Sequence, residues 1–261
     1  MKYLRIIFIS FLIVLLGHAN LDAQSLKGMS LSGATGLYSI PSGRIGWERS
    51  SDFGLDLGYH TIISGGKAAH IPKLSASLFK WLELSGAFDI RPENERGNDF
   101  LTGIKIQFPI TRTALALGGN IQSIGMGENE YYTAGQVYLA VSYAGTFFDM
   151  PAETTVVLGK TFRDPTDSSI DFGMGFDMLL LPGIFEGFVH WITDFSNFSY
   201  SDKPYGADSI WRGVLNTGLR IDLSRIPALN RFKFVIDVMM VDAFDKNRAF
   251  SMGLVFGIPI L

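Results

Sequence analysis

Strict alternation of apolar with polar or small residues runs from near residue 52 to the end of the chain, in short segments separated by turn signals. In one such segment, Phe234 and Ile236 fall on one face while Lys233 and Asp237 fall on the other. Successive side chains of a strand point to opposite sides, so each segment predicts a strand with one apolar and one polar face. Segments of about ten residues are also long enough to cross a bilayer when tilted.

The N-terminal residues 1–23 have the pattern of a secretory signal peptide. Lys2 and Arg5 precede an apolar core of about eleven residues, which is within the usual length for a signal and shorter than a spanning helix. We expect cleavage near Ala23, although Leu21 is not the small residue usual at the −3 position. The alternative is an uncleaved N-terminal anchor. Export through this signal predicts localisation to a Gram-negative-type outer membrane.

Composition separates a membrane barrel from other exported folds. The chain has no cysteine, which excludes lipoprotein acylation, disulfides and thiolate metal sites. It is 47% hydrophobic, with 29 glycines and 21 phenylalanines, yet no apolar run after residue 23 is long enough for a spanning helix. A soluble β-sandwich would share the alternation without needing an apolar face on every strand. The net charge of −3 and the lack of a basic run argue against a nucleic-acid partner.

The fold expected is therefore an all-β, antiparallel transmembrane outer-membrane β-barrel, spanning residues 52–261. Bacterial single-chain barrels have even strand numbers, and twelve segments are found; the alternative is 14 strands, with residues 29–38 supplying one more. Otherwise residues 24–51 form a periplasmic or lumen-filling segment. The expected strands are 52–62, 69–80, 82–90, 98–109, 112–122, 131–144, 153–162, 168–180, 184–195, 210–222, 232–242 and 247–260.

The connections alternate between short turns, often with proline, and longer polar loops. Such barrels have short turns on the periplasmic rim and longer loops outside, so the longest connection, residues 196–209, is expected to be extracellular. Phe198, Tyr200 and Tyr205 in this loop are candidates for sugar stacking, or for an aromatic girdle at the membrane interface.

Charged residues on the inward faces are the main candidates for a functional site. Three basic residues, Arg212, Arg220 and Lys233, lie on two neighbouring strands, after the acidic Asp171, Asp177 and Glu186. Opposed walls of charge would create a transverse field, as in a porin constriction; alternatively, the charges pair and fill the lumen. Small inward residues such as Gly173 and Gly175 favour a water-filled lumen. The remaining lumen candidates are Asp56, Lys73, Glu83 and Lys105.

Catalytic patterns are weak. Ser64 and His70 share the first outer loop, as a rim hydrolase would require, but serines occur in the loops of every barrel. The sequence has no G-x-S-x-G, phosphate loop or metal-ligand spacing. We therefore expect no enzyme activity, no cofactor and no metal.

Residues 32–44 resemble a stretch near the start of the YjbH-like family of Gram-negative envelope proteins, which are associated with exopolysaccharide production. The family pattern G-x-x-G-L-x-x-x-P-[ST]-x-R is matched by Gly33, Gly36, Leu37, Pro41, Ser42 and Arg44. A later element of the family, W-L-E-x-x-x-x-[FY], is similar to Trp81, Leu82 and Glu83 with Phe88. The family block that follows, D-x-x-x-G-x-K, is similar to Asp99, Gly103 and Lys105. Members are often lipoproteins and are longer than this chain. The resemblance, over about residues 30–120, implies an envelope location, a barrel-type fold and a glycan-linked role, without catalytic residues.

Three functions are compatible with these patterns. The first is a porin-like channel or conduit, linked to exopolysaccharide export. The second is a plugged structural barrel whose outer loops bind a partner, and the third and weakest is an outer-membrane lipid or glycan hydrolase. The partners expected are outer-membrane lipid, the barrel-assembly machinery during biogenesis and, for a conduit, a glycan.

Overall fold

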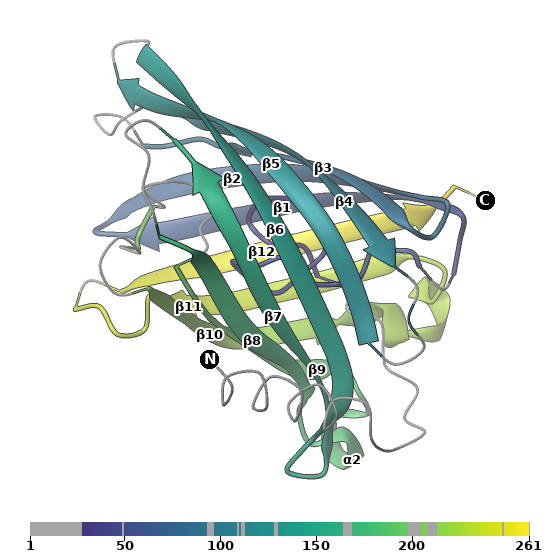
Figure 1. Cartoon of the computed structure of the whole chain (residues 1–261). Helices are drawn as coiled ribbons and strands as arrows, with labels where there is room; N and C mark the ends of the chain where they lie inside the picture. Colours follow the sequence, from purple (N-terminus) through teal and green to yellow (C-terminus); the bar gives the residue numbers. More distant parts are fainter. Residues whose placement is uncertain are drawn as a thin grey trace, which may run out of the picture.

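The computed structural model describes residues 28–48, 50–92, 97–108, 110, 113–127, 130–163, 169–197, 205–207, 213–246 and 248–260. Over these residues the chain forms one closed antiparallel barrel of twelve strands, seen from the side in Figure 1. The strands are β1 (Phe53–Ser64), β2 (Lys67–Leu78), β3 (Leu82–Asp89), β4 (Asp99–Phe108), β5 (Thr113–Gly127), β6 (Glu130–Phe147), β7 (Met150–Phe162), β8 (Asp171–Leu179), β9 (Val189–Ser196), β10 (Val214–Asp222), β11 (Lys233–Val241) and β12 (Ala249–Pro259).

Every strand pairs with its neighbours in sequence, and the barrel closes where β1 meets β12. Ten residue pairs join these two strands, from Gly54 opposite Pro259 to Ile63 opposite Phe250. Closure leaves no sheet edge with unpaired backbone groups, which a bilayer would not tolerate. The predicted barrel and its twelve strands are confirmed, and the alternative of fourteen strands is wrong.

The predicted faces are realised as an apolar outer surface and a polar interior. Leu57, Leu74, Ile104 and Val238 are among many exposed large apolar residues at outward positions. Phe79 and Trp81 stack at the turn between β2 and β3, as expected of an interfacial aromatic girdle. Among the described residues, no helix is long and apolar enough to cross a membrane.

The strand predicted at 184–195 begins later, at Val189, because its first residues form the short helix α2 (Pro182–Phe185). Pro182 occupies the start of this helix, and Glu186 and Gly187 follow it with positive φ angles of 49° and 84°. Glu186 is therefore exposed in the turn before β9, so its predicted place in the lumen is wrong. A left-handed backbone cannot continue into a strand, which explains the correction.

The residues before β1 lie inside the barrel. Residues 28–47 are buried without exception, and we call residues 28–48 the plug. In Figure 1 the plug is the dark purple chain that crosses the interior behind β6. Two isolated bridges, Met29 with Thr35 and Gly36 with Pro41, fold it into compact turns rather than a strand of the barrel.

Candidate functional site: the plugged lumen

The plug folds against the inner wall through its own tight turns. Gly33 has a φ of 88°, and a side chain there would place its Cβ 2.5 Å from the carbonyl oxygen of Gly86 in β3. Only glycine combines this backbone conformation with such a close approach. The glycine at position 33 is thus explained by the close contact between the plug and the wall.

Carboxylates of the wall hold N–H groups of the plug. Asp194 in β9 accepts hydrogen bonds from the backbone N–H groups of Tyr38 and Ser39, at 2.9 and 2.7 Å, and from the Ser39 hydroxyl at 2.8 Å. Glu83 in β3 accepts from the N–H groups of Thr35 and Gly46, at 2.9 and 3.1 Å. These charge-assisted bonds satisfy plug donors that would otherwise be buried without a partner.

Basic side chains of the wall hold carbonyl groups of the plug. Lys73 Nζ donates to the carbonyls of Met29 and Ser30 at 3.2 and 2.8 Å. Lys105 Nζ donates to Thr35 at 2.9 Å, and Arg220 Nη1 donates to Gly36 at 3.2 Å. The wall therefore recognises the plug mainly through its backbone.

One plug side chain forms a buried ion pair with the wall. Arg44 Nε lies 2.6 Å from Glu153 Oε2 in β7, and Arg44 Nη1 lies 2.8 Å from Glu48 Oε1 within the plug. Burial alone would lower the pKa of Arg44, but the carboxylates of Glu153 and Glu48 more than offset this and raise it. The guanidinium therefore stays charged at physiological pH.

A second cluster anchors the end of the plug that leads into β1. The Trp47 indole N–H donates to Asp56 Oδ1 at 2.9 Å, and Lys233 Nζ lies 2.7 Å from Asp56 Oδ2. The same ammonium group sits over the Trp47 ring, 5.0 Å from its centroid, in a cation–π contact. Gly54 lies so close to the ring that an added Cβ would come within 2.3 Å of it.

Apolar plug residues fill the space above small wall residues. An added Cβ at Gly173 would lie 2.7 Å from Ile40, and one at Gly175 would lie 2.6 Å from Leu37. The small inward residues of β8 therefore accommodate the plug, whereas the sequence had suggested that they leave room for water.

The half of the lumen nearer the turn between β1 and β2 is apolar on one side, which the alternation of the sequence does not reveal. Inward residues of β1, β2 and β4 there, including Ile62, Ile71 and Leu101, are at most 1% exposed. Tyr205 packs with them in one apolar cluster, and its hydroxyl donates to the carbonyl of Ser64 at 3.2 Å. Tyr205 is therefore buried at the outer mouth, so its predicted role on an exposed binding loop is wrong.

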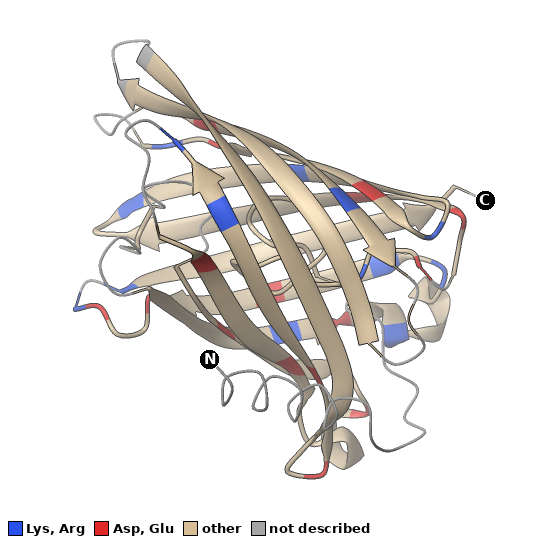
Figure 2. Cartoon of the chain, in the orientation of Figure 1, with Lys and Arg blue, Asp and Glu red and all other residues tan. Residues whose placement is uncertain are grey.

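The other predicted lumen residues are buried in the barrel interior. Acidic and basic residues are spread around the barrel in Figure 2 and are not gathered into two opposed walls. Arg220 pairs with Asp237 at 2.7 Å, and Lys233 pairs with Asp56, so both basic residues are neutralised within the wall. Phe198, Tyr200 and Arg212 lie outside the described residues. The predicted residues at buried positions are Asp56, Lys73, Glu83, Lys105, Asp171, Asp177, Arg220 and Lys233.

The predicted Ser64 and His70 pair is not assembled as a hydrolase site. His70 lies in β2 rather than in a loop, and its Nδ1 is 2.6 Å from the Tyr59 hydroxyl on the outer face. The two rings are stacked, 6.0 Å apart. Among the described residues, no cluster of His, Cys, Asp or Glu could hold a metal ion.

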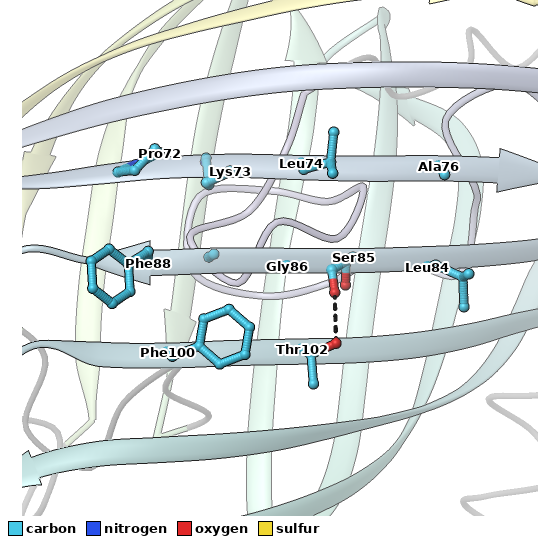
Figure 3. Close-up of a pocket in the computed structure, with 11 residues that line it drawn as sticks. Pro72, Lys73, Leu74, Ala76, Leu84, Ser85, Gly86, Phe88, Phe100 and Thr102 are labelled. Atoms are coloured by element: carbon cyan, nitrogen blue, oxygen red, sulfur yellow. Dashed lines mark hydrogen bonds between the residues drawn. The ribbon is translucent and has the colours of Figure 1, made fainter. Parts of the chain in front are cut away.

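The outer face of β2, β3 and β4 carries a groove with a volume of about 570 Å³, separate from the plugged lumen. Figure 3 shows that Gly86 leaves a gap between larger side chains, with the Thr102 hydroxyl bonded to the Ser85 carbonyl at 3.4 Å. Leu74, Leu84 and Phe88 on its borders are at least 40% exposed, so the groove faces outward and not into the lumen. Its remaining lining residues are Pro72, Lys73, Ala76, Ala87 and Phe100.

No known protein family matches the chain, and no curated protein matches it. It is similar in structure to the KdgM porin in complex with disordered oligogalacturonate, with a TM-score of 0.50 and 8% identity, over 79% of this chain and 99% of that one. Two further similar structures are the NanC porin (TM-score 0.49, 12% identity, 79% of this chain and 100% of that one) and LpxR from Salmonella typhimurium (0.46, 12%, 78% and 100%). The likeness to KdgM is one of fold. The chain has the fold of a porin-like outer-membrane β-barrel.

Proposed function

We propose that this protein is an outer-membrane conduit whose plug closes the lumen until it is displaced. The observation that carries the proposal is the buried charge on the wall: Lys73, Lys105 and Arg220 are at most 5% exposed and hydrogen-bond the plug backbone. If the plug filled the lumen permanently, charged wall residues would stabilise the barrel no more than apolar residues of similar volume. A wall that must also face water needs such groups, because water solvates them once the plug leaves.

The chemistry of the contacts supports displacement as well. Most plug–wall bonds run between charged wall side chains and backbone groups of the plug. Water can replace either partner, at a net cost of about 1.5–3 kcal/mol for each bond to a charged group. The apolar residues Leu37 and Ile40 close the remaining gaps. The resting barrel is then sealed to ions, although its wall is polar.

We further propose that the signal peptide is cleaved near Ala23, that the barrel-assembly machinery inserts the barrel, and that lipid chains fill the groove beside Gly86. The resemblance to the YjbH-like family adds the proposal that the solute is an exported glycan. We propose no enzymatic activity, because His70 is bonded to Tyr59 and faces outward.

A disulfide lock between plug and wall tests the proposal. The Ser39 and Ser196 hydroxyls are 3.2 Å apart, so the double variant Ser39→Cys, Ser196→Cys places two thiols within reach of a disulfide. The chain has no cysteine of its own, so only the intended bond can form. In planar bilayers we expect the oxidised protein to stay closed and the reduced protein to show voltage-induced openings.

The matched control is Ser75→Cys, Ser85→Cys, which joins two directly opposed wall residues and leaves the plug free. It should open equally well in oxidised and reduced form. If heat-modifiable, folded protein stays silent even after reduction, the conduit proposal fails. The barrel is then the plugged structural alternative, and its partner would be sought at the outer loops.

A further inference from the structure

We infer that the lumen, once the plug has left it, selects for cations and neutral solutes and rejects polyanions. The inference rests on the proposed function, because it concerns the open state. It is drawn from the charges that the described strands present to the interior and from the groups with which the plug covers them.

Carboxylates outnumber basic groups on the buried face of the barrel. The described strands carry four buried basic residues, Lys73, Lys105, Arg220 and Lys233. Two buried acidic residues, Asp89 and Asp99, share the guanidinium of Arg91, which lies just beyond β3. The buried acidic residues on the same strands number ten in all: Asp56, Glu83, Asp89, Asp99, Glu153, Asp171, Asp177, Asp194, Asp222 and Asp237. The described plug alters this balance little, because it contributes Arg44 and Glu48, of opposite sign.

The basic groups are largely neutralised by the wall itself. Lys105 lies 2.8 Å from Glu83, and the Arg220–Asp237 and Lys233–Asp56 pairs also join strand to strand. These pairs stay intact when the plug leaves, since both members of each belong to the barrel. The basic residues are therefore poorly placed to attract an anion in the lumen.

Three carboxylates on adjacent strands form what we call the acidic stripe: Glu153 in β7, Asp171 in β8 and Asp194 in β9. The stripe runs along the lumen, because Glu153 lies opposite Asp177 and Asp171 lies opposite Gly159. On the wall, Asp171 accepts from the neutral Thr161 and Gln136, and Asp194 accepts from the neutral Asn216. The cationic or donor partners of Glu153 and Asp194 come from the plug, as Arg44, Tyr38 and Ser39.

The plug thus acts as a built-in ligand of two members of the acidic stripe, supplying a guanidinium to Glu153 and N–H groups and a hydroxyl to Asp194. A solute that replaces it must offer the same chemistry, which a cation or a neutral polyhydroxylated chain does. A polyanion offers none of it and meets the field of the excess carboxylates in a narrow, low-dielectric pore. An exported glycan that uses this lumen is accordingly uncharged or cationic.

Reversal potentials of the full chain in asymmetric KCl test the inference. The variant Arg44→Ala, which loosens the plug, is used to populate open channels, and heat-modifiability on a gel verifies its fold. We expect K⁺ to permeate several-fold better than Cl⁻. The triple change Glu153→Gln, Asp171→Asn, Asp194→Asn should bring the permeability ratio close to one. Asp52→Asn, which removes an exposed carboxylate at the periplasmic rim, should leave the ratio unchanged.

The outcomes separate the two proposals. Open channels that prefer Cl⁻, or whose K⁺ preference survives the triple change, overturn the selectivity inference and leave the conduit intact. Folded protein without any openings, in Arg44→Ala as in the reduced lock variant, overturns the conduit and the selectivity with it.

Discussion

Arg44 of the plug and Glu153 of β7 lie 2.6 Å apart, and each side chain is only 5% exposed. The pair joins a segment before the barrel to a strand 109 residues later in the chain. It is the ionic contact that ties the plug to the wall most directly, since Glu48 on the other side of Arg44 belongs to the plug itself.

Arg44→Ala should loosen the plug. The change leaves Glu153 buried without its cation, and breaking such a pair costs about 3–5 kcal/mol. We expect a higher open probability in planar bilayers, and a partial restoration of closure in Arg44→Lys, which keeps the charge but not the planar fork. Lys80→Ala breaks an exposed pair with Asp52 and should leave the open probability unchanged. Equal open probabilities for Arg44→Ala and the unmodified protein would show that this pair does not hold the plug.

Asp194→Asn should release the central turn of the plug. In either orientation the new NH₂ group meets another donor. It faces the N–H groups of Tyr38 and Ser39 at the Oδ2 position, or the Asn216 NH₂ group at the Oδ1 position, at a cost of about 1–3 kcal/mol. Hydrogen exchange at the backbone amides of residues 38 and 39 should accelerate at least tenfold. Asp171→Asn, a buried carboxylate bonded to Thr161 and Gln136, should not change exchange at these two amides. Unaltered exchange in Asp194→Asn would mean that other contacts hold this turn.

Gly54→Ala should displace Trp47. The new methyl group would come within 2.3 Å of the indole, so the ring must move and lose its bond to Asp56. Overpacking of this kind costs about 1–3 kcal/mol, and tryptophan fluorescence should shift to the red as the ring meets water. Gly135→Ala adds the same methyl group to β6, where nothing lies within 4 Å, and should leave the spectrum unchanged.

Asp237→Asn should destabilise the barrel itself. Asp237 pairs with Arg220 through both of its oxygens, at 2.7 and 2.9 Å, and also lies 3.5 Å from His60. The neutral variant leaves the guanidinium buried and uncompensated, at a cost of about 3–5 kcal/mol. A lower urea midpoint for unfolding in detergent micelles should report the loss. If Asp237→Asn unfolds at the same urea concentration as the exposed Asp52→Asn control, the pair is not a determinant of stability.

The class of fold and its twelve strands could be predicted from the sequence because a strand repeats every two residues. For example, Lys233 and Asp237 fall on one face of a strand and Phe234 and Ile236 on the other. This alternation can be recognised without knowing which strands lie beside it. Inward positions such as Lys73 and Arg220 follow from the same rule. It failed at Glu186, because the local turn around Pro182 replaces the start of a strand, and at Tyr205, because burial of a loop residue depends on distant partners.

A barrel with an apolar outside and a charged inside follows from the order of residues along each strand, since these properties depend on local periodicity. What fills that interior follows only from the folded structure. Residues 28–48 have no regular period, and their place depends on contacts such as Arg44 with Glu153 and Tyr38 with Asp194, separated by 109 and 156 residues. Such pairings exist only once the barrel has closed, because closure is what brings the wall of β7 and β9 around the plug.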